Sequence, residues 1–538
     1  MKVWDGRWLA SFWQKARVRF SKRSEMNNEG DAMNKGYVYL VGAGPGDIGL
    51  ITVKGLECIQ RADVIVYDRL ANPRLLSYAR PDAKYIYVGK TPDHHTLKQE
   101  EINEVLVEEA LQGQVVTRLK GGDPYVFGRG GEEGERLREA DVPFEVVPGI
   151  TSAIAVPSYA GIPVTHRHLT STFTVITGHE DPLKASSQIN WQRLAEDPGT
   201  LIFLMGVGHL AQIVAQLVDH GKSAATPIAL IRWGTRPEQQ VVVGTLATIV
   251  EDVARAGLTS PAIIIVGEVV TMRDTLSWFE QKPLFGQRIL VTRAREQASA
   301  FSRMIEEAGG EAWEAPTIAI DSAAETPELR DAVAKAGNYD WIIFTSVNGV
   351  QAFFDAMRES GLDIRSLGKA KICAIGPKTK EALEAKGLIV AAMPEKFVAE
   401  SVLECLKPLL NFGEKILLPR SDLARTLLVD TLRDLGMKVD EVVAYRTKKV
   451  DRFNDEILEK LRDKSIHIVT FTSSSTVKNF MELVGDKEIL EGIRLASIGP
   501  VTTKTLAEFG LTPDIEATDY TIKGLFNAIV ETVNKEDA

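Results

Sequence analysis

The stretch Thr117-Arg-Leu-Lys-Gly-Gly-Asp-Pro-Tyr-Val-Phe-Gly-Arg-Gly-Gly-Glu-Glu133 joins a short apolar strand, Val115–Leu119, to two glycine-rich turns. Glycines let a backbone approach a ligand closely, because no Cβ stands in the way and unusual φ values cost little. In open α/β sheets, ligands bind at the loops that follow the carboxyl ends of strands. The loop lacks the Lys-Ser/Thr of a phosphate-binding loop. It is therefore predicted to hold a cofactor, and a tight surface turn is the alternative.

The chain is long and acidic, with 538 residues and a net charge of −10. This length is too great for one core, so three or more domains are expected. The acidic balance leaves no sequence-wide basic field for nucleic acid. The longest apolar run, Ala262–Val266, is too short to span a bilayer. These features predict a cytoplasmic protein with no nucleic-acid partner and no membrane span.

Three widely separated cysteines argue for a reducing compartment and against a disulfide framework or a zinc site. Histidines are paired at His94-His95, but neighbouring side chains on an extended chain point in opposite directions. His166 and His168 can share a face, and for them carboxylate recognition is favoured over metal binding. No bound metal is expected.

Residues 1–33 differ from the rest of the chain, because tryptophans there alternate with lysines and arginines. A basic amphipathic helix on a membrane surface is one interpretation. The polar stretch Ser24–Asn34 and a second methionine, Met33, favour another. We expect a disordered or misassigned extension.

From Gly36 onward, β-type runs alternate with helical stretches, which is typical of an α/β fold. Strands are predicted at Tyr37–Val41, Val64–Tyr67, Lys84–Val88, Val115–Leu119, Phe144–Val147, Thr172–Thr177, Thr200–Met205, Pro227–Ile231 and Ala262–Val266. Helices are predicted at Thr52–Arg61, Glu100–Leu111 and His209–His220. The first half ends near Thr271, and residues 272–286 are predicted to form a linker.

The second half repeats itself, since three segments recur in the same order at nearly constant spacing. The pairs are Ile289–Arg293 with Ile416–Arg420, Phe344–Phe353 with Phe471–Phe480, and Ile375–Leu388 with Ile498–Leu511. The repetition predicts two similar lobes whose strand-end loops face a shared cleft. Each Ile-Gly-Pro-x-Thr places a hydroxyl at the start of a helix, where N–H groups attract anions. Thr379 and Thr502 therefore contact a ligand, cap their helices, or do both.

The first half carries an ordered set of motifs. Its glycine-rich opening, Gly42–Gly46, is not a dinucleotide fingerprint, because Pro45 interrupts it. The motifs that follow are Val66-Tyr-Asp68-Arg-Leu70, Val88-Gly-Lys90, Gln99–Asn103, Gly121-Gly-Asp123-Pro, Val147–Ser152, Gly161–Arg167 and Ser260–Gly267. In this order and spacing they closely resemble the uroporphyrinogen-III C-methyltransferases of the tetrapyrrole methylase family, over about Lys35 to Phe279.

The second half resembles the uroporphyrinogen-III synthases over about Gly286 to Val533, through its duplication and the segment Ala444–Thr447. Together the resemblances imply a two-domain tetrapyrrole methylase fold followed by a bilobal α/β synthase fold. The implied divisions are a methyltransferase at 34–271, with subdomains at about 34–150 and 165–271, and a synthase at 287–534, with lobe one at 287–320 plus 447–534 and lobe two at 321–442. The chain would cross between lobes near Ala315–Ile320 and Val443–Val450. A homodimer through the methyltransferase half is expected.

Two consecutive reactions follow from the resemblance. The synthase closes hydroxymethylbilane to uroporphyrinogen III with inversion of one ring and loss of water, using no cofactor. The methyltransferase moves methyl groups from two S-adenosylmethionine molecules to C2 and C7 of that product, giving precorrin-2 for sirohaem and cobalamin. The alternative is a methylase for a later corrin intermediate, joined to a tetrapyrrole-binding half without catalytic activity.

Site residues are carried over by the same resemblance. The methyl donor is expected against Pro45, Gly121, Gly122, Asp123, Val126, Thr151, Ser152, Met205 and Gly234. Asp68 is the candidate base, and it is not needed as a helix cap because Asn72-Pro73 supplies one. Lys90 would orient the substrate, with a solvated lysine as the alternative, and Tyr445 would assist departure of the bilane hydroxyl or orient the bilane. Substrate contacts in the synthase are expected from Arg293, Thr345, Ser346, Thr379, Arg420, Thr472, Ser473 and Thr502.

Local cations must line each site, because the substrates carry many carboxylates and the chain is acidic. The candidates are Arg69, Lys90, Lys120, Arg129, His166 and Arg167 in the first half, and Arg293, Arg295, Lys378, Arg420, Arg425, Arg446 and Lys504 in the second. Arg293 and Arg420 are favoured because they occupy matching positions of the repeat.

Overall fold

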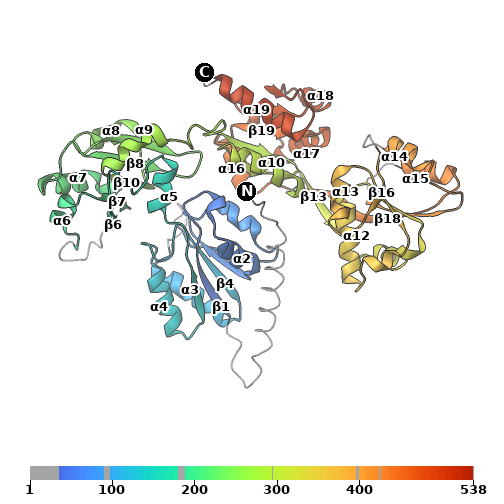
Figure 1. Cartoon of the computed structure of the whole chain (residues 1–538), viewed down its shortest axis with the longest axis horizontal. Coiled ribbons are helices and arrows are strands. Elements are labelled where there is room, and N and C mark those ends of the chain that lie inside the picture. The colour runs from blue at the N-terminus through green and yellow to red at the C-terminus, as the bar shows by residue number, and fades with distance from the viewer. Residues whose placement is uncertain are drawn as a thin grey trace. The chain divides into compact units, whose positions relative to one another are not determined.

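The chain folds into two compact units that divide between Gln281 and Lys282 (Figure 1). The computed structural model describes residues 36–89, 97–179, 188–293, 295–394, 399–422 and 426–536. The predicted extension at 1–33, together with Lys90, His94-His95 and Arg425, lies outside the described residues. The division falls within the stretch 272–286, for which a linker is predicted.

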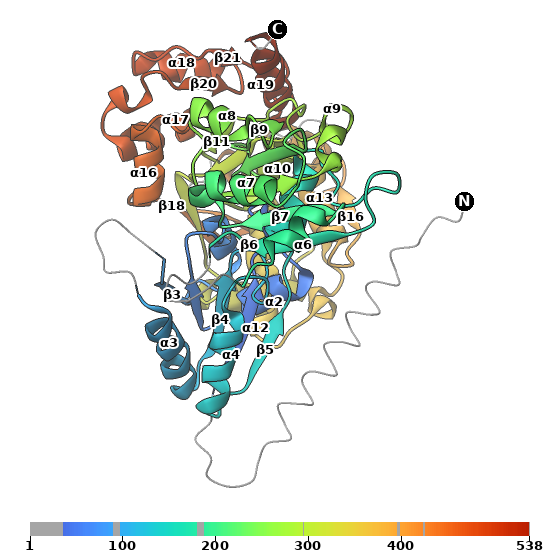
Figure 2. The same cartoon turned by 90° about the vertical axis from the view of Figure 1, so that its left-hand side faces the viewer.

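The first unit begins with a fully parallel sheet in the order β3-β2-β4-β1-β5. Its strands are β1 Tyr37–Gly42, β2 Val64–Tyr67, β3 Lys84–Tyr87, β4 Val115–Lys120 and β5 Phe144–Val147. One face packs against α2 (Val53–Arg61) and the other against α3 (Gln99–Leu111) and α4 (Gly130–Glu139), which lie side by side in Figure 2. Both faces are covered because neighbouring strand residues, such as Leu40 and Val41, point to opposite sides.

A second, mixed sheet follows in the order β6-β7-β10-β8-β9. Its strands are β6 Phe173–Thr177, β7 Thr200–Leu204, β8 Pro227–Arg232, β9 Gln240–Thr245 and β10 Ala262–Val266. Helices α6 (Trp191–Glu196), α7 (Leu210–Asp219) and α8 (Ile249–Ala256) cover one face, and α5 (Ser152–Tyr159) packs on the other. The edge strand β9 has no sequence-predicted counterpart, because it is only half-buried and contains Gly244.

The first unit ends with a segment that folds back on helix α5. After η4 (Glu268–Met272) and α9 (Arg273–Leu276), the chain packs against the carboxyl end of α5. The Trp278 indole N–H donates to the Ser158 carbonyl at 3.0 Å, and Arg273 donates to the Ala160 carbonyl at 2.7 Å. We call residues 273–280 the return segment.

The second unit contains two sheets. Lobe one has the order β12-β11-β19-β20-β21, from β11 Arg288–Val291, β12 Glu311–Glu314, β19 Ile468–Phe471, β20 Arg494–Ser497 and β21 Ile515–Glu516. Lobe two has the order β13-β18-β17-β14-β15-β16, from β13 Ile318–Ser322, β14 Trp341–Phe344, β15 Lys371–Ala374, β16 Val390–Ala392, β17 Lys415–Ser421 and β18 Lys438–Lys449.

Helices cover both faces of each of these sheets. In lobe one they are α10 Arg295–Glu307 and α19 Ile522–Glu536 on one face, and α16 Asp455–Arg462, α17 Ser474–Val484 and α18 Pro500–Glu508 on the other. In lobe two they are α11 Pro327–Ala334, α12 Val347–Glu359 and α13 Pro377–Glu384 on one face, and α14 Ala399–Leu406 and α15 Leu427–Asp434 on the other.

The strand orders show the duplication directly. The run β12-β11-β19-β20-β21 of lobe one corresponds position by position to β18-β17-β14-β15-β16 of lobe two. The repeated sequence segments fall on matching elements, with Ile289 in β11 and Ile416 in β17. The chain passes between lobes through β13 and β18, which pair antiparallel from Ile318–Lys449 to Ser322–Tyr445. Across the parts of the chain that the structure describes, no helix has the length and apolar character needed to cross a membrane.

Candidate functional site

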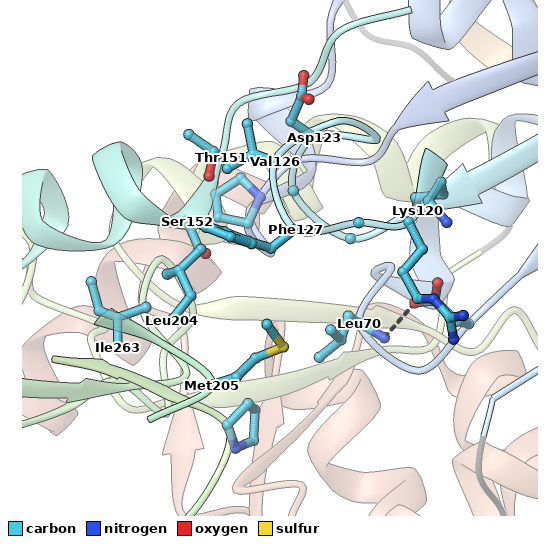
Figure 3. A pocket seen from close by; sticks show the side chains of 18 of the residues that line it. Leu70, Lys120, Asp123, Val126, Phe127, Thr151, Ser152, Leu204, Met205 and Ile263 are labelled. Atoms are coloured by element: carbon cyan, nitrogen blue, oxygen red, sulfur yellow. Dashed lines mark hydrogen bonds between the residues drawn. The ribbon is translucent and has the colours of Figure 1, made fainter. Parts of the chain in front are cut away.

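A cavity of about 610 Å³ opens in the first unit, where the strand ends of its two sheets meet (Figure 3). Side chains from both sheets surround it: Lys120 belongs to β4, Leu204 ends β7 and Ile263 belongs to β10. Every residue expected to hold the methyl donor lines this cavity, namely Pro45, Gly121, Gly122, Asp123, Val126, Thr151, Ser152, Met205 and Gly234. The structure thus brings together nine positions that are scattered through 190 residues of sequence.

Glycines bring three backbone segments into close contact beside this cavity. We call Gly44, Gly121, Gly122 and Gly149 the glycine floor. Gly44 and Gly122 exchange backbone hydrogen bonds of 3.2 and 2.7 Å, and both have positive φ values, +77° and +69°. A Cβ on Gly149 would stand 2.3 Å from the Gly122 carbonyl oxygen, and a Cβ on Gly121 would stand 2.5 Å from the Leu70 Cβ. Side chains are therefore excluded at these positions, and the backbone segments approach one another closely.

The Asp123 carboxylate holds these loops in place. One oxygen accepts from the Tyr125 N–H at 2.8 Å and the other from the Gly149 N–H at 3.0 Å. Beyond it, four non-glycine residues with positive φ line the cavity: Phe127, Arg129, Met205 and Trp233. Such conformations cost free energy and persist where surrounding packing imposes them, commonly at binding sites.

Asp68 lies on the cavity wall at the end of β2, where the side chain is 24% exposed. Its Oδ1 accepts from the Leu70 N–H at 3.0 Å, and its Oδ2 accepts from Arg118 Nη2 at 3.1 Å. Asn72 caps the following turn by accepting from the Arg74 N–H, as the Asn72-Pro73 pattern predicts. The Asp68 carboxylate is thus fixed in one orientation while part of it stays accessible from the cavity.

A buried ion cluster beside Asp68 was not predicted from the sequence. Arg118 Nε and Lys120 Nζ both donate to Glu133 Oε1, at 3.2 and 2.7 Å. All three side chains are at most 5% exposed. Burial lowers the pKa of Lys120, Arg118 lowers it further, and Glu133 opposes both effects.

The sequence predicts that Lys120 meets substrate carboxylates, but in the structure its ammonium pairs with Glu133. The two residues are separated by a loop in the sequence, so no local pattern marks their contact.

A second hollow of about 690 Å³ shares Phe127, Arg129 and Met205 with the cavity. Arg129 pairs there with Glu132 at 2.6 Å. His179 lines the hollow, and its Nδ1 lies 3.2 Å from His209 Nε2, a contact that the sequence did not indicate. The rings of His166 and His168 lie 5.7 Å apart. Within the described ranges, no group of three or more His, Cys, Asp or Glu side chains is arranged to hold a metal ion.

In the second unit, the predicted hydroxyl residues fall into two kinds. Ser346 and Ser473 cap α12 and α17 by accepting from the N–H groups of Gly349 and Thr476, and Thr345 and Thr472 precede them as half-buried residues. Thr379 and Thr502 lie inside the first turns of α13 and α18 and are buried. The capping alternative for this second pair is wrong, because the cap positions are Gly376 and Gly499.

The repeated arginines differ in their surroundings. Arg420 is 2% exposed within β17, with its Nε 3.5 Å from Glu441 Oε1. Arg293 follows β11 and is half-buried, and burial lowers its pKa. Tyr445 lies in β18 opposite Ser322 of β13, within the antiparallel connection between the lobes. Its ring packs partly against the core of lobe two.

Comparisons with known proteins agree with both halves. The family model of Tetrapyrrole (Corrin/Porphyrin) Methylases matches residues 37–250, and that of Uroporphyrinogen-III synthase HemD matches residues 299–527. A Ruminiclostridium josui protein named "Porphyrin biosynthesis protein HemD" is 39% identical, over 93% of this chain and 98% of its own length. The Uroporphyrinogen-III C-methyltransferase of Priestia megaterium is 58% identical, over 44% of this chain and 98% of its own length.

Among solved structures, the uroporphyrin-III C-methyl transferase of Thermus thermophilus complexed with S-adenyl homocysteine is 39% identical, with a TM-score of 0.38. It covers 44% of this chain and 99% of its own length. The sequence relatives favour a complete pair of activities over a methylase joined to an inactive half. The chain therefore belongs to the tetrapyrrole methylase family in its first half and to the uroporphyrinogen-III synthase family in its second, and it is a bifunctional enzyme of porphyrin biosynthesis with C-methyltransferase and synthase activities.

Proposed function

We propose that the cavity of the first unit binds S-adenosylmethionine, and that this unit methylates C2 and C7 of uroporphyrinogen III to give precorrin-2. The second unit supplies that substrate by closing hydroxymethylbilane without a cofactor. The observation that carries the proposal is the convergence of all expected donor-binding residues on one cavity. Its volume of about 610 Å³ lies within the range of about 300–1,000 Å³ that is usual for small-molecule sites.

The glycine floor fits an extended donor of this kind. Gly121 and Gly122 line the cavity without a Cβ, and Gly149 packs its backbone closely against that of Gly122. Thr151 and Ser152, at the start of α5, present polar groups to the same space, and Val126 and Met205 present apolar ones. When bound, the donor supplies a methyl group on a sulfonium centre, and holding that group in line with a ring carbon provides most of the rate enhancement.

The proposed role of Asp68 is to accept a proton. Methylation of a ring carbon must be followed by loss of a proton, so a nearby base accelerates the step. Both Asp68 oxygens keep a lone pair after accepting from Leu70 and Arg118. Arg118 fixes the orientation of the carboxylate, and Lys90, which is outside the described residues, is proposed to orient the substrate.

In the synthase half, strand-end residues of both lobes are proposed to bind the bilane. Thr345 and Thr472 stand at matching strand ends, next to the capping serines Ser346 and Ser473. Arg293 and Arg420 are proposed to offset carboxylate charge, and Thr379 and Thr502 are proposed to contact the bilane. Tyr445 is proposed to assist departure of the hydroxyl, and ring closure at an unchanged rate in Tyr445→Phe would remove that role.

The test of the methylase proposal uses the purified full-length chain, uroporphyrinogen III and methyl-labelled S-adenosylmethionine. A product heavier by two methyl groups, labelled on the ring, is expected. Unlabelled uroporphyrinogen III, recovered from enzyme that binds no donor, would contradict the proposal. We also propose that the protein is a cytoplasmic homodimer. Light scattering of the purified protein measures the mass of the assembly and so tests the dimer.

A further inference from the structure

The charged cluster of Arg118, Lys120 and Glu133 beside the donor cavity has an inner and an outer part. Arg118 and Lys120 line the cavity, while Glu133 stands behind them at 0% exposure. Both cations donate to Glu133 Oε1, and Glu133 Oε2 makes no hydrogen bond to any described residue. A buried carboxylate oxygen that accepts no hydrogen bond costs free energy, which the two cations on Oε1 partly offset.

Within this cluster, Lys120 has a pKa that is lowered from its ordinary value. Burial and the neighbouring Arg118 both lower its pKa, and the Glu133 carboxylate is the main group that offsets them. Asp68 adds a smaller stabilising effect. With all groups ionised, the two cations balance Asp68 and Glu133. The four-residue cluster is therefore close to neutral, and removal of any one of its charges would give the cluster a net charge.

Net charge in this cluster matters because the expected ligands differ in charge. S-adenosylmethionine carries a sulfonium cation, whereas S-adenosylhomocysteine, the product left after transfer, lacks both the methyl group and that charge. The rest of the two molecules is the same. In a partly buried site, water screens such a charge difference much less than at an open surface.

We propose that Lys120 and Glu133 set how strongly the cavity discriminates between the cationic donor and its neutral product, with Lys120 opposing the cation and Glu133 favouring it. This inference rests on the donor site proposed above. Lys120 thereby favours methyl transfer, because this step removes the positive charge of the sulfonium. Glu133 offsets the charge of Lys120, so the donor can still bind.

The experiment measures the dissociation constants of S-adenosylmethionine and S-adenosylhomocysteine by calorimetry on the full-length protein. In Lys120→Met, the ratio of the donor constant to the product constant should fall by about threefold to tenfold, the effect of one unit charge near a partly buried site. In Glu133→Gln, the ratio should rise by a similar factor at mildly acidic pH, where Lys120 keeps its proton. The affinity for the neutral product reports whether the cavity has kept its shape.

Glu139→Gln is the matched control, because it removes the same charge from the same helix, α4, at a side chain that is 70% exposed. In this variant, the ratio of the donor dissociation constant to the product dissociation constant should equal that of the wild type. Unchanged ratios in both Lys120→Met and Glu133→Gln, with product affinity retained, would overturn the inference while leaving the donor site intact. Failure of the wild type to bind either molecule would instead reject the donor site itself.

Discussion

At the scale of single residues, Asp68 is the most direct probe of the methyl-transfer step. Asp68→Asn keeps the shape and the Leu70 contact but removes the basic oxygen, so methyl transfer should slow by about 100-fold or more. Affinity for the neutral product S-adenosylhomocysteine, measured by calorimetry, should change little, because that molecule carries no sulfonium charge. Asp82→Asn is the control, because Asp82 is an exposed carboxylate that also pairs with an arginine. Equal rates in Asp68→Asn and wild type would show that the proton leaves by another route.

The glycine floor provides a matched pair of substitutions. A Cβ on Gly149 meets the Gly122 carbonyl oxygen at 2.3 Å, whereas a Cβ on Gly131 meets nothing within 4 Å. Gly149→Ala should therefore destabilise the first unit by about 2 kcal/mol or more and abolish donor binding. Gly131→Ala, within helix α4, should stabilise it by about 0.5–1 kcal/mol. Urea unfolding measures both, and a Gly149→Ala protein as stable as the wild type would contradict the close backbone crossing.

At the scale of elements, the return segment reaches the donor cavity through a chain of hydrogen bonds. Glu280 Oε1 accepts from Gln239 Nε2 at 2.7 Å, and Gln239 Oε1 accepts from the Thr235 N–H at 3.1 Å. Thr235 Oγ1 in turn accepts from the Asp47 N–H at 3.0 Å, in the loop that contains Pro45. The stretch predicted as a linker thus helps to position the loop over the donor site.

Glu280→Ala tests this positioning. The donor dissociation constant should rise by about threefold or more, because the Gln239 amide loses a charged partner, while the rate at saturating donor stays near that of the wild type. Glu268→Ala, an exposed acid in the preceding η4, should leave the constant unchanged. Equal donor affinity in both variants would mean that the return segment does not influence the site.

Elements made of local patterns could be predicted from the sequence. The apolar strands and the glycine turns were found because alternation, turn chemistry and strand-end position are local signals. The edge strand β9 could not be predicted, because it is only half-buried and shows no such pattern. The contacts of Glu133 with Arg118 and Lys120 could not be found, because they join a helix to a strand and depend on tertiary packing. Burial of Thr379 and Thr502 could not be inferred from a motif that fits an exposed cap equally well.

At the scale of the whole molecule, each unit buries a thiol whose titration makes stability depend on pH. Burial raises the pKa of Cys58 from 9.0 to about 11 and that of Cys373 from 9.0 to about 12. The folded state then binds more protons than the unfolded state above pH 9, so this contribution to stability is complete below pH 9 and is lost as the pH rises toward these values.

The pH dependence is measured as the urea midpoint of each unit between pH 8.5 and about 11, a window that runs from just below the ordinary thiol pKa of 9.0 up to the raised pKa of Cys58 and below that of Cys373. The slope attributable to one thiol approaches about 1.4 kcal/mol per pH unit. Cys58→Ala should flatten the decline in the first unit and Cys373→Ala in the second. Parallel declines in variant and wild type would show that these thiols ionise as easily when folded as when unfolded.

The duplication of strand order and the fusion of two consecutive enzymes make one combined assay the most direct test of the whole molecule. Hydroxymethylbilane is supplied with and without S-adenosylmethionine, and the isomer and mass of the product are determined. Without the donor, uroporphyrinogen III should form, and with it, a dimethylated product of the type III isomer. Formation of the type I isomer alone, or a product mass that the donor does not change, would contradict the account.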